Sequence, residues 1–393
     1  MNADSAESDN PMHPAISWKE VRATHSARWQ SESRLPPPKR VIVADDTMKA
    51  DAAYHHACEG TAMLWRGDFQ NAKMLLQAIA RRADNRARAS IKPDATPAAF
   101  PQAFHLHRQA QAQRARMLGM LLIPFDAGHI IPLGRAPDVQ LACYQIHGAA
   151  NEAYVTSLRE LLGIIGAHEW RKSGIELHAA GGRIHPHYGV FAPVRSEYVQ
   201  LVADAPLPSS ELAFDIGTGT GVLAAVLARR GVARVIATES DTRALACARD
   251  NVSQLGLAGR VEILEANLFP DLPTAGRAPL IVCNPPWIPS RPSSPLEHAI
   301  YDFESRMLRG FLNGLTAHLA SGGEGWLILS DIAEHLGLRT RDELLAWIEK
   351  AGLKLLGKTD VKPKHPRARD VTDPLHKARA AEVTSLWRLA ARD

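Results

Sequence analysis

From residue 212 onward, short apolar runs alternate with longer segments whose apolar residues recur every three or four positions. The runs predict buried strands and the periodic segments predict helices. The expected strands are 212–216, 234–238, 261–265, 280–283, 325–330, 353–357 and 383–389, and the expected helices are 221–230, 241–255, 304–319 and 340–351. Such alternation is typical of a doubly wound, mostly parallel sheet with helices on both faces, so we predict an α/β fold here.

The pattern before residue 169 is different. Residues 1–38 are polar, rich in serine and proline, and end in three prolines, which predicts a flexible tail. Residues 39–168 contain a strand-like run at 41–44 and helix-like segments at 69–82, 104–122, 137–147 and 151–166. We therefore predict a smaller, largely helical N-terminal domain. The second domain should comprise residues 169–393 and begin with a hairpin within 175–190.

The composition agrees with two globular domains. The chain has 393 residues, of which 46% are hydrophobic and 22% are charged. The first 40 residues lack the basic start and apolar run of a signal peptide. The longest conspicuously apolar stretch, 117–123, is far shorter than the roughly 20 residues that span a bilayer. With four scattered cysteines and no CxxC pair, we expect a cytoplasmic protein with reduced thiols and no membrane span.

The distribution of charge is more informative than the net charge of +4. Residues 81–116 contain eight Lys or Arg against two Asp, and residues 358–369 contain five against one. The basic helix within the first segment is either a solvated face or a contact for phosphate groups. The paired histidines, His105 with His107 and His185 with His187, lack a neighbouring cluster of acidic or thiol ligands, so we expect no metal site.

A glycine-rich turn follows the strand at 212–216. Residues 214–221 read FDIGTGTG, and such glycines let a backbone approach a ligand and adopt positive φ. Ligands of doubly wound sheets bind at the carboxyl ends of the strands. The dinucleotide pattern GxGxxG would need glycine at Val222, so a dinucleotide site is disfavoured. Glu239 ends the next strand, where its carboxylate could accept both hydroxyls of a ribose. A tight turn without a ligand is the structural alternative.

Residues 282–289 read VCNPPWIP and follow the strand at 280–283. An exocyclic amine or an amide nitrogen is a poor nucleophile, because its lone pair is delocalised. Two acceptors, the Asn284 side-chain oxygen and the Pro285 carbonyl, could each hold one N–H and direct the lone pair toward a methyl group. The prolines hold that carbonyl in place. Trp287 offers a flat face on which a planar target could stack.

These residues resemble a known family. Asp215, Gly217, Gly219, Gly221 and Glu239 resemble the S-adenosylmethionine site of class I methyltransferases. The Asn284–Trp287 segment resembles the NPPY-type amino-methyltransferases with their "methyltransferase small" domain, which act on adenine N6, guanine N2 or glutamine N5. The resemblance covers about residues 175–357. It implies a Rossmann-like seven-stranded sheet with an antiparallel last strand. It also implies S-adenosylmethionine as cofactor, with Asn267 at the adenine in place of the family's usual aspartate.

We therefore expect an S-adenosylmethionine-dependent N-methyltransferase that acts on the exocyclic amine of a nucleic-acid base, in RNA or DNA. The expected catalytic residues are Asn284, Pro285 and Trp287, and the expected cofactor-binding residues are Asp215, Gly217, Gly219, Gly221, Glu239 and Asn267. Three alternatives stay open. They are a protein glutamine N5-methyltransferase, which the Ile288-Pro289 continuation favours, a small-molecule N-methyltransferase, and a non-catalytic binding module.

Overall fold

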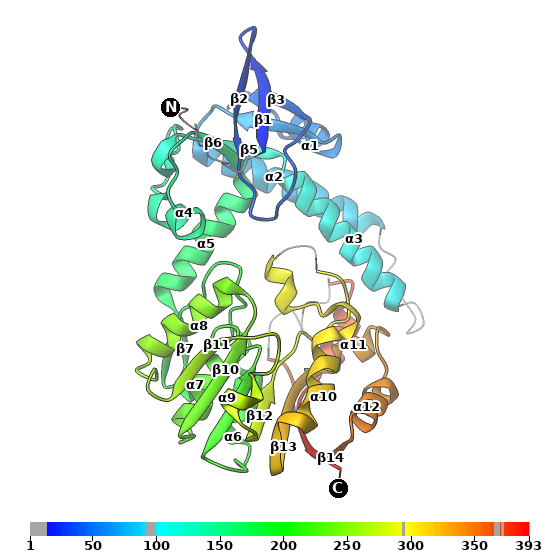
Figure 1. Cartoon of the computed structure of the whole chain (residues 1–393). Coiled ribbons are helices and arrows are strands. Elements are labelled where there is room, and N and C mark those ends of the chain that lie inside the picture. Colours follow the sequence, from blue (N-terminus) through cyan, green and yellow to red (C-terminus); the bar gives the residue numbers. More distant parts are fainter. Residues whose placement is uncertain (1–13, 91–99, 293–294, 365–369, 371–372, 393) are drawn as a thin grey trace, which may run out of the picture. The chain divides into compact units, whose positions relative to one another are not determined.

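The computed structural model describes residues 14–90, 100–292, 295–364, 370 and 373–392 (Figure 1). The chain divides into two compact units. The first comprises residues 1–91 and 108–166, and the second comprises residues 92–107 and 167–393. Among the described residues, no helix combines the length and the apolar character that a membrane crossing requires.

The described part of the second unit is built on one seven-stranded sheet with the order β11-β10-β9-β12-β13-β15-β14. The strands are β9 (Leu212–Ile216), β10 (Arg234–Glu239), β11 (Val261–Glu265), β12 (Ala278–Cys283), β13 (Leu319–Ser330), β14 (Leu353–Val361) and β15 (Thr384–Ala391). Strands β9 to β13 pair in parallel, and β15 is antiparallel to both β13 and β14. This order confirms the predicted doubly wound sheet. From β9, the chain builds the sheet outward in one direction through β10 and β11, and then in the other direction from β12, so the strand order reverses between β9 and β12.

Helices cover both faces of this sheet, as Figure 1 shows. The helices are α6 (Glu197–Asp204), α7 (Val222–Arg229), α8 (Thr242–Gln254), α9 (Leu272–Ala275), α10 (Arg306–His318), α11 (Ile332–His335), α12 (Arg341–Lys350) and α13 (His376–Ala381). Ala213 belongs to a buried cluster with α6 and α7, whereas its neighbour Phe214 belongs to a second cluster with α10 and α12. Successive strand residues thus fill two separate cores. The predicted hairpin is present as β7 (Ile175–Leu177) and β8 (Gly182–Ile184).

The first unit contains a six-stranded sheet within its described residues, with the order β1-β2-β6-β5-β4-β3. The strands are β1 (Ala15–Glu20), β2 (Ala23–Trp29), β3 (Arg40–Ala44), β4 (Thr61–Trp65), β5 (Leu121–Phe125) and β6 (Tyr154–Ser157). The helices are α1 (Ala50–Cys58), α2 (Phe69–Ser90), α3 (Phe100–Leu118), α4 (Gln140–His147) and α5 (Leu158–Ser173). The first eight residues of α3 and the last seven of α5 belong to the second unit.

Two predictions for the N-terminal region were wrong. The predicted flexible tail is wrong for residues 15–29, which form the β1–β2 hairpin. In β1, the buried side chains of Ile16 and Trp18 alternate with exposed residues, so one face of this strand is buried. Residues 1–13 lie outside the described residues. The prediction of a largely helical domain missed the sheet. Strand β6 lies within the predicted helix 151–166, and β5 begins at the end of the predicted helix 104–122; both are short strands that are buried on both faces. Periodicity cannot separate such a run from part of a buried helix.

Candidate active site

The glycine loop lies at the carboxyl end of β9, where the strand order reverses. Gly217 and Gly219 have φ values of 70° and 56°. A Cβ atom on Gly217 would overlap the Met307 methyl carbon, whereas a Cβ on Gly219 would meet no described atom within 4 Å. Gly217 therefore lets the end of the flexible Met307 side chain lie against the loop backbone, and Gly219 opens onto free space. The third predicted glycine, Gly221, precedes α7 with a φ of 81°.

Asp215 lies beneath this loop and is only 1% exposed. Its Oδ2 accepts hydrogen bonds from the Thr218 hydroxyl at 2.6 Å and from the Ala224 N–H at 3.0 Å. Its buried Oδ1 has no hydrogen-bond partner among the described residues. Burial raises the pKa of the Asp215 carboxyl to about 6. Asp215 therefore ties the loop to the start of α7 and leaves one buried oxygen unsatisfied.

Glu239 stands at the end of β10, next to the loop. Its Oε2 accepts the Gly219 N–H at 3.1 Å, and its Oε1 accepts the N–H groups of Ser240 at 2.8 Å and Asp241 at 3.1 Å. A carboxylate offers about four lone-pair sites, so these bonds orient Glu239 without exhausting it. Asn267 is exposed two residues beyond β11, at the same edge of the sheet.

The NPPW segment begins directly after β12. Because Cys283 pairs with Ile216 in the parallel register, Asn284 and Gly217 leave the sheet side by side. Asn284 is half-buried and Pro285 is buried. The Trp287 indole N–H donates a hydrogen bond to Asn284 Oδ1 at 2.9 Å. The structure thus brings the predicted acceptor and the glycine loop together.

The surroundings of Trp287 differ from those of an open stacking surface. Its ring is half-buried and packs against three buried clusters of the second unit. The Arg195 guanidinium carbon lies 5.5 Å from the ring centroid. The predicted stacking face is therefore already in contact with protein side chains, and the indole N–H is engaged within the segment itself.

Sequence reasoning missed two buried side chains that support this edge. Asn251 of α8 is fully buried; its Oδ1 accepts the His185 N–H at 2.7 Å, and its Nδ2 donates to the Thr220 carbonyl at 2.9 Å. It holds the glycine loop against the segment after β8. Phe104 of α3 is 2% exposed and joins an apolar cluster that Trp287 borders. The sequence did contain a signal for Asn251, because a polar residue on the apolar stripe of a helix is buried and needs hydrogen-bond partners.

The basic segments are partly neutralised. Arg82 pairs with Asp51 at 2.7 Å, and Arg114 pairs with Asp84 at 2.6 Å. At the other segment, the Lys358 ammonium pairs with Asp360 at 2.8 Å, while residues 365–369 lie outside the described residues. Within the described ranges, no group of three or more His, Cys, Asp or Glu side chains is arranged to hold a metal ion.

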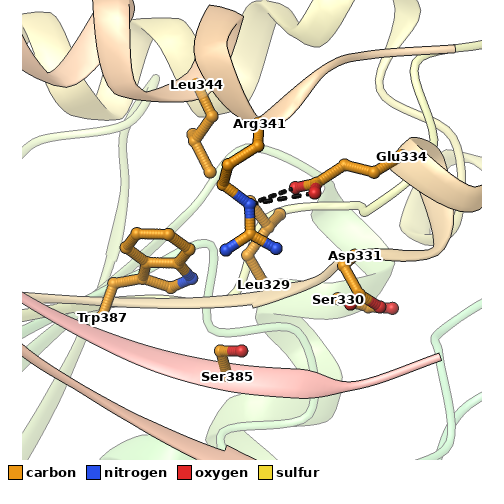
Figure 2. A pocket seen from close by; sticks show the side chains of 8 residues that line it. All are labelled: Leu329, Ser330, Asp331, Glu334, Arg341, Leu344, Ser385 and Trp387. Atoms are coloured by element: carbon orange, nitrogen blue, oxygen red, sulfur yellow. Dashed lines mark hydrogen bonds and ion pairs between the residues drawn. The ribbon is translucent and has the colours of Figure 1, made fainter. Parts of the chain in front are cut away.

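Figure 2 shows a pocket bordered by β13, β15 and α12. Arg341 Nε donates to both Glu334 carboxylate oxygens at 2.9 Å, and the Arg341 guanidinium lies over the Trp387 ring. The Ser385 hydroxyl donates to Asp360 at 2.7 Å. These lining groups are paired within the protein, and the pocket contains none of the predicted site residues. We assign it a structural role.

Comparison with known proteins identifies the fold and chemistry of the second unit. Residues 183–341 match the model of the Methyltransferase small domain family. The chain is 30% identical over 220 residues to the tRNA1(Val) (adenine(37)-N6)-methyltransferase of Shewanella amazonensis, covering 51% of this chain and 92% of that relative. It is 33% identical over 141 residues to the release factor glutamine methyltransferase of Cereibacter sphaeroides, covering 33% of this chain and half of that relative.

A solved methyltransferase from Pyrococcus furiosus aligns with 57% of this chain and 96% of its own at 18% identity and a TM-score of 0.39. Assignment of the fold therefore relies on the family match and on the observed strand order. Together they confirm the predicted enzyme class and cofactor. The chain belongs to the methyltransferase small domain family and is a class I S-adenosylmethionine-dependent methyltransferase.

Proposed function

We propose that the enzyme methylates an amino nitrogen conjugated to a π system, namely the exocyclic amine of a nucleic-acid base. The observation that carries this proposal is the register of β9 and β12, which sets Asn284 beside Gly217. A hydrogen-bond acceptor thus stands at the carboxyl edge where the cofactor of such a sheet binds. An amine needs such acceptors because its lone pair is otherwise delocalised.

The residues at this edge fit S-adenosylmethionine. We assign Glu239, already oriented by three backbone N–H groups, to the ribose hydroxyls, and Asn267 to the adenine amino group. Gly219 leaves the open space that a ligand needs, and the unpartnered Asp215 Oδ1 offers a negative charge beneath a cationic cofactor. When bound, the cofactor supplies an electrophilic methyl group.

Asn284 and Pro285 hold the target nitrogen. The Asn284 side-chain oxygen accepts one N–H of the amine and the Pro285 carbonyl accepts the other, which turns the lone pair away from the ring. The indole N–H of Trp287 uses one lone pair of Asn284 Oδ1 and leaves the second for the substrate. Fixed acceptors of this kind also stabilise the positive charge that develops on the nitrogen.

The relative from Shewanella amazonensis, which this chain covers over 92% of its length, supports a nucleic-acid substrate. Its name specifies adenine N6 of a tRNA. In the first unit, Arg81, Arg86 and Arg116 are exposed and suit a polyanion. The second named relative acts on a protein glutamine, so transfer to protein is the competing outcome of the test.

The test supplies the enzyme with labelled S-adenosylmethionine and with RNA, DNA and protein fractions from cells that lack the gene. We expect label in a methylated base of RNA or DNA after digestion to nucleosides. Asn284→Ala should bind the cofactor normally and turn over about 10²- to 10³-fold more slowly. Label confined to glutamine would replace the proposed substrate, and full turnover by Asn284→Ala would overturn the mechanism.

A second test concerns the polyanion. Binding of RNA should weaken with salt at a slope of about −0.7 to −0.9 per phosphate contact, and Arg81→Glu with Arg116→Glu should flatten that slope. Arg234→Glu is the matched control, because Arg234 is half-exposed and begins β10 at the opposite edge of the sheet from Asn284. Affinity that is indifferent to salt would favour the protein substrate.

A further inference from the structure

The hydrogen bond within the NPPW segment defines how the Asn284 amide is turned. The Trp287 indole N–H is a donor only, so it can bond to the amide oxygen but not to the amide nitrogen. At 2.9 Å from Asn284 Oδ1, it selects one of the two orientations in which an amide can sit. If the amide rotated by half a turn, this bond would be lost and an N–H would replace the acceptor.

The indole is itself held in place. The Arg195 guanidinium carbon lies 5.5 Å from its ring centroid, at a distance typical of a cation–π contact. Arg195 Nη2 donates to Glu382 Oε2 at 3.0 Å. The second oxygen of Glu382 accepts the Ser330 hydroxyl at 2.8 Å. These contacts connect the segment before α6, the last residue of β13 and the segment before β15.

The carboxylate of this ion pair is withdrawn from water, whereas the guanidinium is partly accessible. The Glu382 side chain is 4% exposed and the Arg195 side chain is 24% exposed. A buried ion pair contributes little net stability compared with apolar residues of the same size, because its desolvation offsets the Coulombic attraction. The ion pair instead restricts the position of Arg195, because a planar guanidinium bonded to a fixed carboxylate can occupy few positions.

We infer that Arg195 and Glu382 are positioning residues that act through Trp287 to keep the Asn284 oxygen turned toward the substrate. The inference rests on the proposed catalytic role of Asn284. It also changes the role of Trp287, because the indole N–H becomes essential and an open stacking face does not. The Trp287→Phe variant, which a stacking role would tolerate, should therefore be impaired.

Three variants separate these roles. Trp287→Phe keeps the ring and removes the N–H. Arg195→Ala alone would leave Glu382 buried and unpaired, so the double variant Arg195→Met/Glu382→Met removes both charges together. Trp347→Phe is the matched control, because Trp347 of α12 lies under the Arg309 guanidinium at the same 5.5 Å and is not part of the motif.

The first readout needs no methyl acceptor. In a ¹H–¹⁵N spectrum, the Trp287 indole signal is the one that disappears in Trp287→Phe. Asn284→Ala and the double variant should both shift it, and Trp347→Phe should leave it in place. If the indole signal stayed at the same position in both Asn284→Ala and the double variant, the inference would be overturned. If no RNA, DNA or protein fraction accepts a methyl group, the proposed function fails and this signal alone decides whether the contacts hold the indole.

The second readout divides kcat from KM on the accepting RNA fraction. Trp287→Phe and the double variant should lower kcat about tenfold, while KM stays within about threefold and cofactor affinity is unchanged. Trp347→Phe should match the unaltered enzyme. A roughly tenfold rise in KM with kcat preserved in Trp287→Phe would show that the ring acts by stacking, and the inference would be wrong.

Discussion

Replacing Asp215 with asparagine should reduce the pH dependence of the protein's stability. The Asp215 carboxyl is 1% exposed, and burial raises its pKa from 3.8 to about 6. The Thr218 hydroxyl and the Ala224 N–H bind one oxygen, but they do not compensate for the loss of water around a full charge. At neutral pH the folded protein therefore contains an ionised carboxylate in an unfavourable place.

The direction in which stability changes with pH follows from proton binding. The folded state binds the proton more tightly than the unfolded chain, so this contribution to stability is fully present below pH 3.8 and is lost as the pH rises through about 6. A shift of about two pKa units at 1.36 kcal/mol each corresponds to about 3 kcal/mol. Between pH 5 and pH 7.5 the change should be about 1.4 kcal/mol, because at pH 5 roughly half of the loss has already occurred.

Urea unfolding of both proteins from pH 4.5 to pH 8, without cofactor, measures this change. The free energy of unfolding of Asp215→Asn minus that of the unaltered protein should increase with pH and become constant above about pH 7. Altered hydrogen bonds to Thr218 add an offset that does not depend on pH, so only the slope is diagnostic. Asp342→Asn, at an exposed position of α12, controls for the substitution itself.

A difference that stays flat over this range would refute the reasoning, because it would mean that burial does not raise the pKa of Asp215. A difference that decreases as the pH rises would refute it more strongly. That result would show that the carboxylate is stabilised by its surroundings, and the unpartnered Oδ1 would then need a donor that the described residues do not supply.

Three further substitutions test the supports of the site. Glu239→Ala should weaken S-adenosylmethionine binding by about 1–3 kcal/mol in calorimetry, and Glu262→Ala, on the exposed side of β11, should have no effect. Asn251→Ala should lower the free energy of unfolding by about 1–3 kcal/mol and also weaken cofactor binding, because the glycine loop loses its bond to α8; normal cofactor affinity would exclude a role at the loop. Phe104→Ala should cost about 3–5 kcal/mol of stability, whereas Leu106→Ala, at a 56% exposed position, should be nearly neutral; equal effects would contradict the burial of Phe104.

The sequence alone was sufficient for the sheet of the second unit. Strands β9, β10 and β12 contain apolar runs bounded by turns, and the longer helices carry apolar stripes, so both signals are local. The residues of the glycine loop and the NPPW segment were also found locally. They follow β9 and β12, and the carboxyl ends of parallel strands meet at one edge.

The sheet of the first unit required tertiary information. Strand β2 is mostly exposed and polar, so nothing in its own composition marks it as a strand. It is held by pairing with β1 and β6, and the Glu160 carboxylate, far along the chain, accepts the Ser33 N–H after it at 2.9 Å. Strands of this kind form because of their neighbours, and local propensity does not predict them.

The roles of individual side chains were likewise predicted in part from the sequence and in part only from the tertiary structure. The sequence by itself placed Asn284 and Trp287 in one motif, because they are three residues apart. Only the tertiary structure decided that the indole donates to the amide and that Arg195 meets Glu382, which lies 187 positions further along the chain. The physical reason is that hydrogen bonds and ion pairs depend on distances in space, which chain folding sets, whereas residue type and periodicity report only whether a segment can be buried.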